Sequence, residues 1–260
     1  MLTSDGTELL GYARQVVEQA NMLEARYEHN EAPQERLAVS AQHYAFSVQA
    51  FINVVEACDA KKFEFTMRET TTAQIIDDVR AFRSEVGILY LDDFNRRVLE
   101  KAFADARVSF HPLFNARVHV FVSESHPLAR KPSICLEDLV PYTRYSFEQG
   151  ASNSFYFSEE PFSYIPCARN IRVSDRGTLT NLLTTSNGYA LSTGVLPSEM
   201  QSGMASIPLK EDAHMLVGYI VHDERRPAPI LTQYLSELRR IIADANRNGA
   251  VLIAEDGTSA

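Results

Sequence analysis

The stretch that decides the fold is residues 36–91, "RLAVSAQHYAFSVQAFINVVEACDAKKFEFTMRETTTAQIIDDVRAFRSEVGILYL". Apolar and polar residues alternate in two of its segments, and a third is wholly apolar; both patterns are typical of strands. These three segments are residues 36–41, 62–69 and 86–91. Between them, residues 42–60 and 71–85 carry apolar side chains at helical spacing. Strand, helix, strand, helix, strand predicts right-handed crossovers and a parallel sheet.

A second group of elements follows this stretch. The periodicity loosens from Asp92 onward, and a clear alternating strand then appears at residues 118–122. Further strands are predicted at 142–147 and 216–223, and helices at 176–188 and 229–246. We therefore expect an α/β fold with two Rossmann-like lobes and a cleft between them. The expected boundaries are residues 33–114 with 214–246 for the first lobe, 115–213 for the second and 247–260 for a C-terminal tail.

The composition is that of an ordinary soluble globular protein, with 45% apolar and 23% charged residues in a chain of 260. A formal net charge of −9 does not favour contact with a phosphate backbone. No run approaches eighteen apolar residues, and the N-terminus lacks the pattern of a signal peptide. The three cysteines are far apart and form no CxxC pair. We expect reduced thiols and a cytoplasmic protein that does not contact membranes.

Short polar side chains follow several of the predicted strands. In open parallel sheets, ligands bind at the carboxyl ends of strands, where helix N-termini offer free N–H groups. Helix capping is the alternative explanation for any single Ser or Thr. Because several such junctions point to one cleft, we expect a site for a small polar ligand that carries a carboxylate. These junctions are Ser40-Ala41-Gln42-His43 and Glu69-Thr70-Thr71-Thr72 in one lobe, and Tyr145-Ser146-Phe147-Glu148, Ser174-Asp175 and Ser192-Thr193 in the other.

Signatures of catalysis and of metal binding are missing from the sequence. The seven histidines are scattered and form no HExxH or other metal-binding spacing. There is no GxSxG, P-loop or GxGxxG motif. The paired acids Asp77-Asp78 and Asp92-Asp93 lie beside a helix or turn, where solvated charge is the usual explanation. These motifs give no support for an enzyme, and we expect no metal and no cofactor.

The N-terminal segment, residues 1–32, has the pattern of a helix that pairs with another helix. Its apolar residues recur at alternating steps of four and three, which describes a narrow coiled-coil seam. They are Leu9, Ala13, Val16, Ala20, Leu23 and Tyr27. Thr3 or Asp5 can cap the start of this helix, and Pro33 ends the pattern. We expect the seam to hold a homodimer or homotetramer together.

Three stretches resemble LysR-type transcriptional regulators, in the order and spacing of that family. "LTSDGTELLGYARQVVEQANMLE" (residues 2–24) is similar to the family's linker helix, which begins with an LT-x-x-G turn. "HPLFNARVHVFVSESHPLA" (residues 111–129) resembles the passage from the first effector lobe into the second. "VSDRGTLTNLLTTSNGYALSTGVLP" (residues 173–197) resembles a later segment in which a helix leads to a Gly-containing turn and a short strand.

The resemblance covers about residues 2–242 and implies the fold of periplasmic solute-binding proteins of the second type. It implies that residues 1–32 pair two protomers. It implies contacts with a small-molecule effector, as hydrogen-bond donors and a wall and not as catalysts, at Ser40, Gln42, His43, Thr70, Thr71, Tyr145, Ser146 and Phe147, with Ser192 and Thr193 as weaker candidates. It also implies that operator DNA is bound only through a winged helix-turn-helix reader. Since this chain starts where the wing should end, we expect either a regulatory-region fragment or a naturally headless relative.

Two other classes of protein stay open beside the regulator. A solute-binding protein would share the fold, but it needs export, and a coiled coil is hard to explain in a monomeric carrier. An enzyme of the same two-lobed architecture would need a charged catalytic group in the cleft.

Overall fold

The computed structural model describes residues 34–150, 154–197 and 202–247, together with Thr3, Gly6, Val17 and Ala20. The chain divides into a small unit, Met1–Glu35 with Ala60–Phe63, and a large unit, Arg36–Asp59 with Glu64–Ala260. Both sheets belong to the large unit, apart from the first residues of β1 and β2.

The first sheet is mixed and has the strand order β2-β1-β3-β10-β4. Its strands are β1 (Glu35–Ala41), β2 (Phe63–Glu69), β3 (Val86–Leu91), β4 (Val108–Arg117) and β10 (His214–His222). β1 and β3 are parallel, with Val39 opposite Val86, whereas β10 runs antiparallel between β3 and β4. The region of loose periodicity after Asp92 forms α4 (Arg96–Ala106) and β4, two elements that the sequence pattern did not predict.

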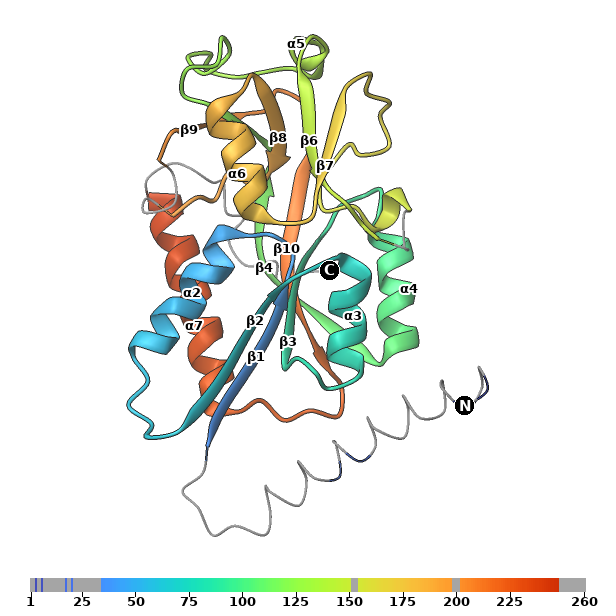
Figure 1. Cartoon of the computed structure of the whole chain (residues 1–260), viewed down its shortest axis with the longest axis vertical. Helices are drawn as coiled ribbons and strands as arrows, with labels where there is room; N and C mark the ends of the chain where they lie inside the picture. The colour runs from blue at the N-terminus through green and yellow to red at the C-terminus, as the bar shows by residue number, and fades with distance from the viewer. Residues whose placement is uncertain are drawn as a thin grey trace. The chain divides into compact units, whose positions relative to one another are not determined.

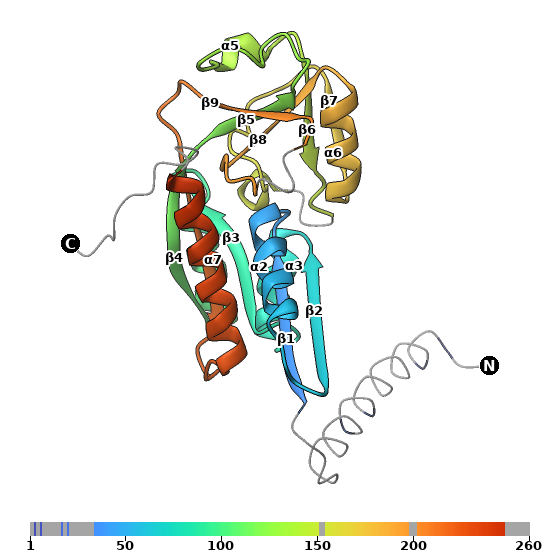
Figure 2. The same ribbon diagram turned by 90° about the vertical axis from the view of Figure 1, so that its left-hand side faces the viewer.

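Two pairs of helices cover the two faces of this sheet (Figure 1). α2 (Ala45–Glu56) and α7 (Pro229–Arg247) lie side by side on one face, and α3 (Thr72–Arg80) and α4 lie on the other (Figures 1 and 2). The apolar stripe of α3, which includes Ile75 and Val79, packs against Leu89 and Leu91 of β3. Because helices cover both faces, every residue of β3 is buried, as its unbroken apolar run predicts.

The second sheet has the strand order β7-β6-β8-β5-β9. Its strands are β5 (His119–Ser123), β6 (Thr143–Phe147), β7 (Asn170–Val173), β8 (Gly188–Ser192) and β9 (Met204–Pro208). The helical segments beside it are α5 (Leu136–Leu139), the 3-10 turn η1 (Phe155–Phe157) and α6 (Arg176–Thr185). β6 is parallel to β7 and β8, and β5 is antiparallel to β8 and β9. The expected α/β fold is therefore confirmed as two mixed sheets with helices.

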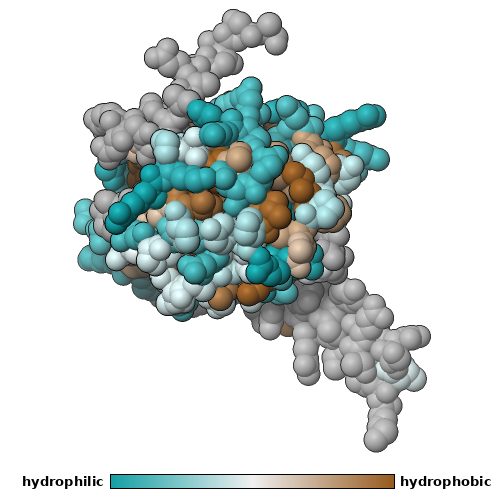
Figure 3. Space-filling model, turned by 90° about the horizontal axis from the view of Figure 1, so that it is seen from above, coloured by the Kyte–Doolittle hydropathy of each residue, from teal (hydrophilic) through white to brown (hydrophobic). Residues whose placement is uncertain are grey.

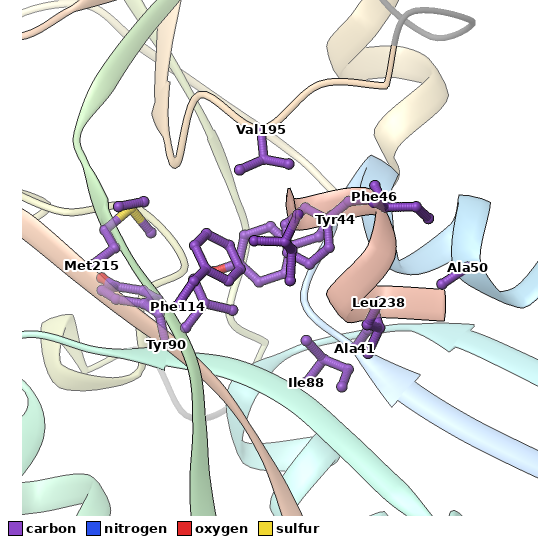
Figure 4. Close-up of a cluster of buried hydrophobic side chains, with 14 of the residues drawn as sticks. Ala41, Tyr44, Phe46, Ala50, Ile88, Tyr90, Phe114, Val195, Met215 and Leu238 are labelled. Atoms are coloured by element: carbon purple, nitrogen blue, oxygen red, sulfur yellow. The ribbon is translucent and has the colours of Figure 1, made fainter. Parts of the chain in front are cut away.

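One buried cluster joins the sheets (Figure 4). Tyr44, Phe46, Ile88 and Phe114 come from the side of the first sheet and are at most 5% exposed. Val195, from the segment after β8, approaches these rings from a separate part of the chain (Figure 4). Burial of each large apolar side chain contributes about 1.5–3 kcal/mol, so this cluster stabilises the contact between the sheets.

The described residues include only one position of the predicted N-terminal seam. Ala20 is helical and exposed, and the other five seam residues lie outside the described residues. Thr3 Oγ1 accepts a hydrogen bond from the N–H of Gly6 at 3.1 Å, as expected of a helix cap. In the described part of the chain, no helix is long and apolar enough to cross a membrane. Figure 3 shows the coloured apolar residues as small areas among polar ones on the face seen from above.

Candidate functional site

A hollow lies between the loop that joins β1 to α2 and the side chains of the second sheet and α6. It measures about 700 Å³ when space open to solvent is included. The first sheet's side supplies only His43, Tyr44 and Ala45. The apolar residues from the other side are Phe121, Phe147, Leu179, Leu183, Ala190, Leu191, Val195, Leu196 and Met204, and the polar ones are Glu159, Glu160, Arg176, Thr180 and Ser192. A concave, mostly apolar wall with a few polar groups is the usual form of a small-molecule site.

An ion pair connects the two sides of this hollow. Oε2 of Glu159 accepts hydrogen bonds from the backbone N–H of His43 at 3.0 Å and from His43 Nδ1 at 2.8 Å. Each of the two side chains is only 4% exposed. The His43 ring also stacks on the ring of Phe147, with centroids 3.8 Å apart and an interplanar angle of 7°. His43 is therefore fixed by two residues of the second sheet's side.

Burial alone would lower the pKa of His43. The hydrogen bond and charge of Glu159 outweigh that effect, the charges of Glu69 and Glu160 act in the same direction, and the pKa of His43 is raised above its ordinary value. His43 therefore keeps its imidazolium form to higher pH than a free histidine does, which strengthens its bond to the Glu159 carboxylate.

Glu160 is also buried but has different partners. Its Oε1 accepts a hydrogen bond from the N–H of Phe147 at 2.7 Å, and its Oε2 accepts one from Ser158 Oγ at 3.1 Å. Burial, followed by the charge of Glu159, raises the pKa of Glu160 to about 8. Two neighbouring carboxyl groups away from water cannot both ionise cheaply. Glu160 is therefore mostly a neutral acid at neutral pH.

Gln42 begins a chain of hydrogen bonds that connects both sheets. Its Nε2 donates to Thr72 Oγ1 at 2.6 Å, the N–H of Thr72 donates to Gln149 Oε1 at 3.4 Å, and Gln149 Nε2 donates to Glu159 Oε1 at 3.2 Å. Gln42, Thr72, Gln149 and Glu159 are all buried. This chain thus links Gln42, just after β1, to the Glu159 carboxylate.

The other candidates of the first sheet do not line the hollow. Ser40 Oγ donates to Asp78 Oδ2 at 2.7 Å, beneath α3. Thr71 is the N-cap of α3, and its Oγ1 accepts the N–H of Gln74 at 3.3 Å. Thr70 is half-buried, just beyond the end of β2. Thr71 therefore acts as a helix cap, which was the alternative explanation for a Ser or Thr at a strand end.

Ser192, the last residue of β8, lines the hollow together with Phe147 of β6. Thr193 is 1% exposed, and its Oγ1 accepts the N–H of Val195 at 3.2 Å. This bond closes a turn in which Gly194 has a φ of +76°, a conformation that favours glycine. Thr193 therefore shapes the turn that places Val195 in the wall.

Tyr145 and Ser146 of β6 bond within the second sheet and its helix. The Tyr145 ring covers Gly188 so closely that a Cβ there would collide with it, and the Tyr145 hydroxyl bonds to Ser186 Oγ. Ser146 Oγ donates to Asn170 Oδ1 at 3.1 Å. These two residues lie outside the wall of the hollow and hold β6, β7 and β8 in place.

Two more contacts join the sheets. Arg176 Nε donates to Glu69 Oε1 at 2.7 Å, with side chains 28% and 23% exposed. Phe94, which precedes α4, stacks on Tyr156 and Tyr164, with ring centroids 4.6 and 4.3 Å away. Both aromatic partners belong to the segment between β6 and β7 that also carries Glu159.

That segment contains the polar residues that the sequence analysis missed. Glu159 and Glu160 follow three aromatic residues and precede Pro161 in "SFYFSEEPFSY", residues 154–164. A solvated loop is rarely so rich in aromatic residues, so acids inside an aromatic run are a usable signal of a packed segment. In the described part of the chain, no group of three or more His, Cys, Asp or Glu side chains could hold a metal ion.

Comparisons with known proteins agree with the resemblance noted from the sequence. The family model for the LysR substrate binding domain matches residues 59–242, well over half of the chain. No curated protein gives a significant sequence match.

Among solved structures, a C206 mutant of Corynebacterium glutamicum OxyR is 19% identical, with a TM-score of 0.60 over 97% of this chain and 79% of that one. HinK, a LysR family transcriptional regulator from Pseudomonas aeruginosa, is 14% identical, with a TM-score of 0.53 over 92% of this chain and 80% of that one. The effector-binding domain of QuiR, in complex with shikimate, is 17% identical, with a TM-score of 0.53 over 80% of this chain and 97% of that one. At these identities the structures show the shared fold, and the family match over residues 59–242 shows the membership. This chain belongs to the LysR substrate-binding domain family.

Proposed function

We propose that this chain senses a small-molecule effector for a transcriptional regulator and that the effector binds in the hollow described above. The observation that carries the proposal is that the wall comes from two places: His43–Ala45 beside the first sheet, and the second sheet with α6. A ligand that contacts both places changes the free energy of their arrangement, which is what a sensor requires. The QuiR domain of the same fold, in complex with shikimate, supports a small ligand.

The wall suits a molecule with an apolar body and a carboxylate. Apolar side chains form most of the wall, and its N–H and O–H donors include those of His43, Arg176, Thr180 and Ser192. Two of these four residues are cations or become cations readily, so a carboxylate matches them better than an amine does. The nearby acid, Glu160, is mostly neutral at pH 7 and does not repel an anion strongly.

Of the ten predicted contacts, we propose that three touch the ligand and that seven position them. The direct contacts are His43, Phe147 and Ser192; the others are Ser40, Gln42, Thr70, Thr71, Tyr145, Ser146 and Thr193. We also propose that residues 33–114 with 214–246, and residues 115–213, are the two lobes that hold the ligand.

A thermal-shift screen of aromatic and aliphatic carboxylates tests the site. A ligand at a hundred times its dissociation constant adds about 2.7 kcal/mol, which raises the melting temperature by about 5–10 °C. Ser192→Trp fills the hollow and should abolish this shift. Ser236→Trp, on an exposed position of α7, is the matched control and should keep it. A ligand whose shift survives Ser192→Trp would place the effector elsewhere.

We further propose that residues 1–32 pair two copies of the cytoplasmic chain and that the chain itself does not bind operator DNA. The seam pattern and the net charge of −9 support this. Val16→Glu with Leu23→Glu places unpaired charges in a dry seam, so light scattering should show a fall in mass while circular dichroism stays unchanged. An unchanged mass would contradict the pairing, and sequence-dependent gel shifts of duplex DNA at physiological salt would contradict the second part.

A further inference from the structure

The segment between β6 and β7 forms a strap, residues 154–164, that spans from the second sheet to the first. Tyr156 and Tyr164 stack on Phe94, which lies just before α4 of the first sheet. Between these two aromatic contacts, Glu159 turns inward and is 6% exposed. The strap is therefore fixed to the first sheet at two rings and one carboxylate.

The Glu159 carboxylate is held as a bound anion is held. Its Oε2 takes the backbone N–H and Nδ1 of His43, and its Oε1 takes the Gln149 amide at 3.2 Å. We call these three donors the polar end of the cleft. His43 also lines the hollow, so the polar end and the apolar wall are contiguous.

The helix that follows His43 has no side-chain cap of its own. Tyr44 is the N-cap of α2, and its side chain makes no capping hydrogen bond. A carboxylate close to a helix N-terminus is stabilised by the free N–H groups and the partial positive charge there. In this chain that carboxylate comes from Glu159, which is 116 residues away from His43 in sequence.

Loss of the Glu159 carboxylate would leave a buried imidazolium, a backbone N–H and an amide without their acceptor. Each buried donor without a partner is costly, and a buried charge without its partner costs most. The donors of the polar end therefore need a carboxylate as their acceptor, and either the chain or a ligand can supply it.

We propose that Glu159 is a built-in occupant of the cleft: its carboxylate fills the polar end, and the strap must withdraw before the carboxylate of a ligand can bind there. The identification of that ligand with the effector rests on the proposed function, whereas the occupancy itself does not. The Glu159 side chain thus holds the two sheets together.

Chemical rescue with formate tests this occupancy in the full chain. Glu159→Ala removes the carboxylate and should lower the melting temperature by roughly 5–15 °C. Sodium formate should then raise the melting temperature of Glu159→Ala by about 3–6 °C more than sodium chloride of equal ionic strength does. In the wild type, sodium formate and sodium chloride should have the same effect on the melting temperature. Glu148→Ala, the removal of an exposed glutamate nearby, is the matched control and should behave like the wild type.

Equal responses to formate in Glu159→Ala and Glu148→Ala would overturn the proposal, because no vacant carboxylate position would then exist. A formate effect of the same size in the wild type would also overturn it, because the anion would bind elsewhere. If Glu159→Ala does not fold, Glu159→Gln keeps the size and one acceptor but removes the charge. Titration of the His43 ring by NMR should then move down toward 6.5 in Glu159→Gln, and an unmoved titration would overturn the proposal.

Failure of the proposed function would give a different result. If formate stabilises Glu159→Ala but no ligand is found in the screen, the proposal about Glu159 stands and only the proposed effector site is rejected. A carboxylate ligand that binds wild type and Glu159→Ala with equal affinity keeps the effector site but shows that Glu159 does not compete for it. If Glu159 competes, Glu159→Ala should bind such a ligand at least about tenfold more tightly.

Discussion

The starts of α2 and α3 differ in the side chains that bond to their cap residues and to the residues just before them, although both helices follow strands of the same sheet. In α3 the N-cap Thr71 accepts the N–H of Gln74 at 3.3 Å. In α2 the N-cap Tyr44 makes no such bond, and the N–H of His43 donates instead to Glu159. The start of α3 thus has a side-chain cap from its own N-cap residue, whereas the residue before the α2 N-cap has a buried carboxylate from the second sheet's side.

The difference decides whether the bonds at each helix start depend on the arrangement of the two sheets. A local cap contributes about 0.5–2 kcal/mol whatever the sheets do, because both partners belong to one turn. A carboxylate from the other sheet contributes only while the two sheets stay together. The start of α2 therefore depends on the arrangement of the sheets through a buried ion pair, whereas the start of α3 depends on it only through the 3.4 Å bond from the Thr72 N–H to Gln149.

The largest expected effect concerns pH and the buried acid Glu160, which lines the hollow beside His43. Glu160 has a pKa of about 8 in the folded protein against 4.5 for an ordinary glutamate, so the folded state binds the proton more tightly. This contribution to the free energy of unfolding is complete below pH 4.5 and is lost as the pH rises through about 8. His43, whose pKa is also raised, acts with the same sign above 6.5. We expect the free energy of unfolding to fall by on the order of 2–4 kcal/mol between about pH 5 and pH 9.

Glu160→Gln should remove most of this fall, because the amide stays neutral at every pH. Urea denaturation at a series of pH values measures the slope directly. Glu148→Gln replaces an exposed glutamate close by and should keep the wild-type slope. A Glu160→Gln protein with an undiminished slope would show that another group titrates.

A smaller effect is expected at the helices with local caps. Asp175 caps α6 by accepting the N–H of Thr178 at 2.7 Å, as Thr71 caps α3. Asp175→Ala and Thr71→Ala should each lower the free energy of unfolding by about 1 kcal/mol, and Asp175→Asn and Thr71→Ser should restore most of it. Chemical denaturation measures the loss. The NMR titration of His43 should not move in Thr71→Ala; a moved titration would mean that this cap is also coupled to the cleft.

Local periodicity was enough to predict the alternating strands and the amphipathic α3. Local periodicity did not predict the elements within residues 92–117. In α4 only Leu99, Phe103 and Ala106 are buried, and this pattern is too sparse to indicate a helix. β4 carries polar and apolar residues without alternation. It is held in the sheet by pairing with β10, about a hundred residues later, as between Ser109 and Val221.

In the candidate site, too, local pattern and topology predicted some features, whereas contacts between residues far apart in sequence could not be predicted. Strand-end residues such as His43 and Ser192 could be placed near a cleft from the topology alone, since carboxyl ends of parallel strands meet. Whether a polar side chain lines the hollow or bonds inward depends on partners far away in sequence, as with Ser40 and Asp78. Glu159 was out of reach for the same reason, because nothing near it in sequence indicates a contact with His43.

The smallest expected effect tests the second ion pair between the sheets, Glu69 with Arg176. At 2.7 Å its geometry matches that of His43 with Glu159, but its side chains are 23% and 28% exposed instead of 4% each. Water and salt screen such a pair, so a double-mutant cycle with Glu69→Gln and Arg176→Gln should give a coupling of less than about 1 kcal/mol that shrinks further at high salt. The cycle is measured by urea denaturation at low and high sodium chloride. A coupling of several kcal/mol that ignores salt would mean that exposure does not separate the two pairs, and that Arg176 holds the sheets together as firmly as the buried pair does.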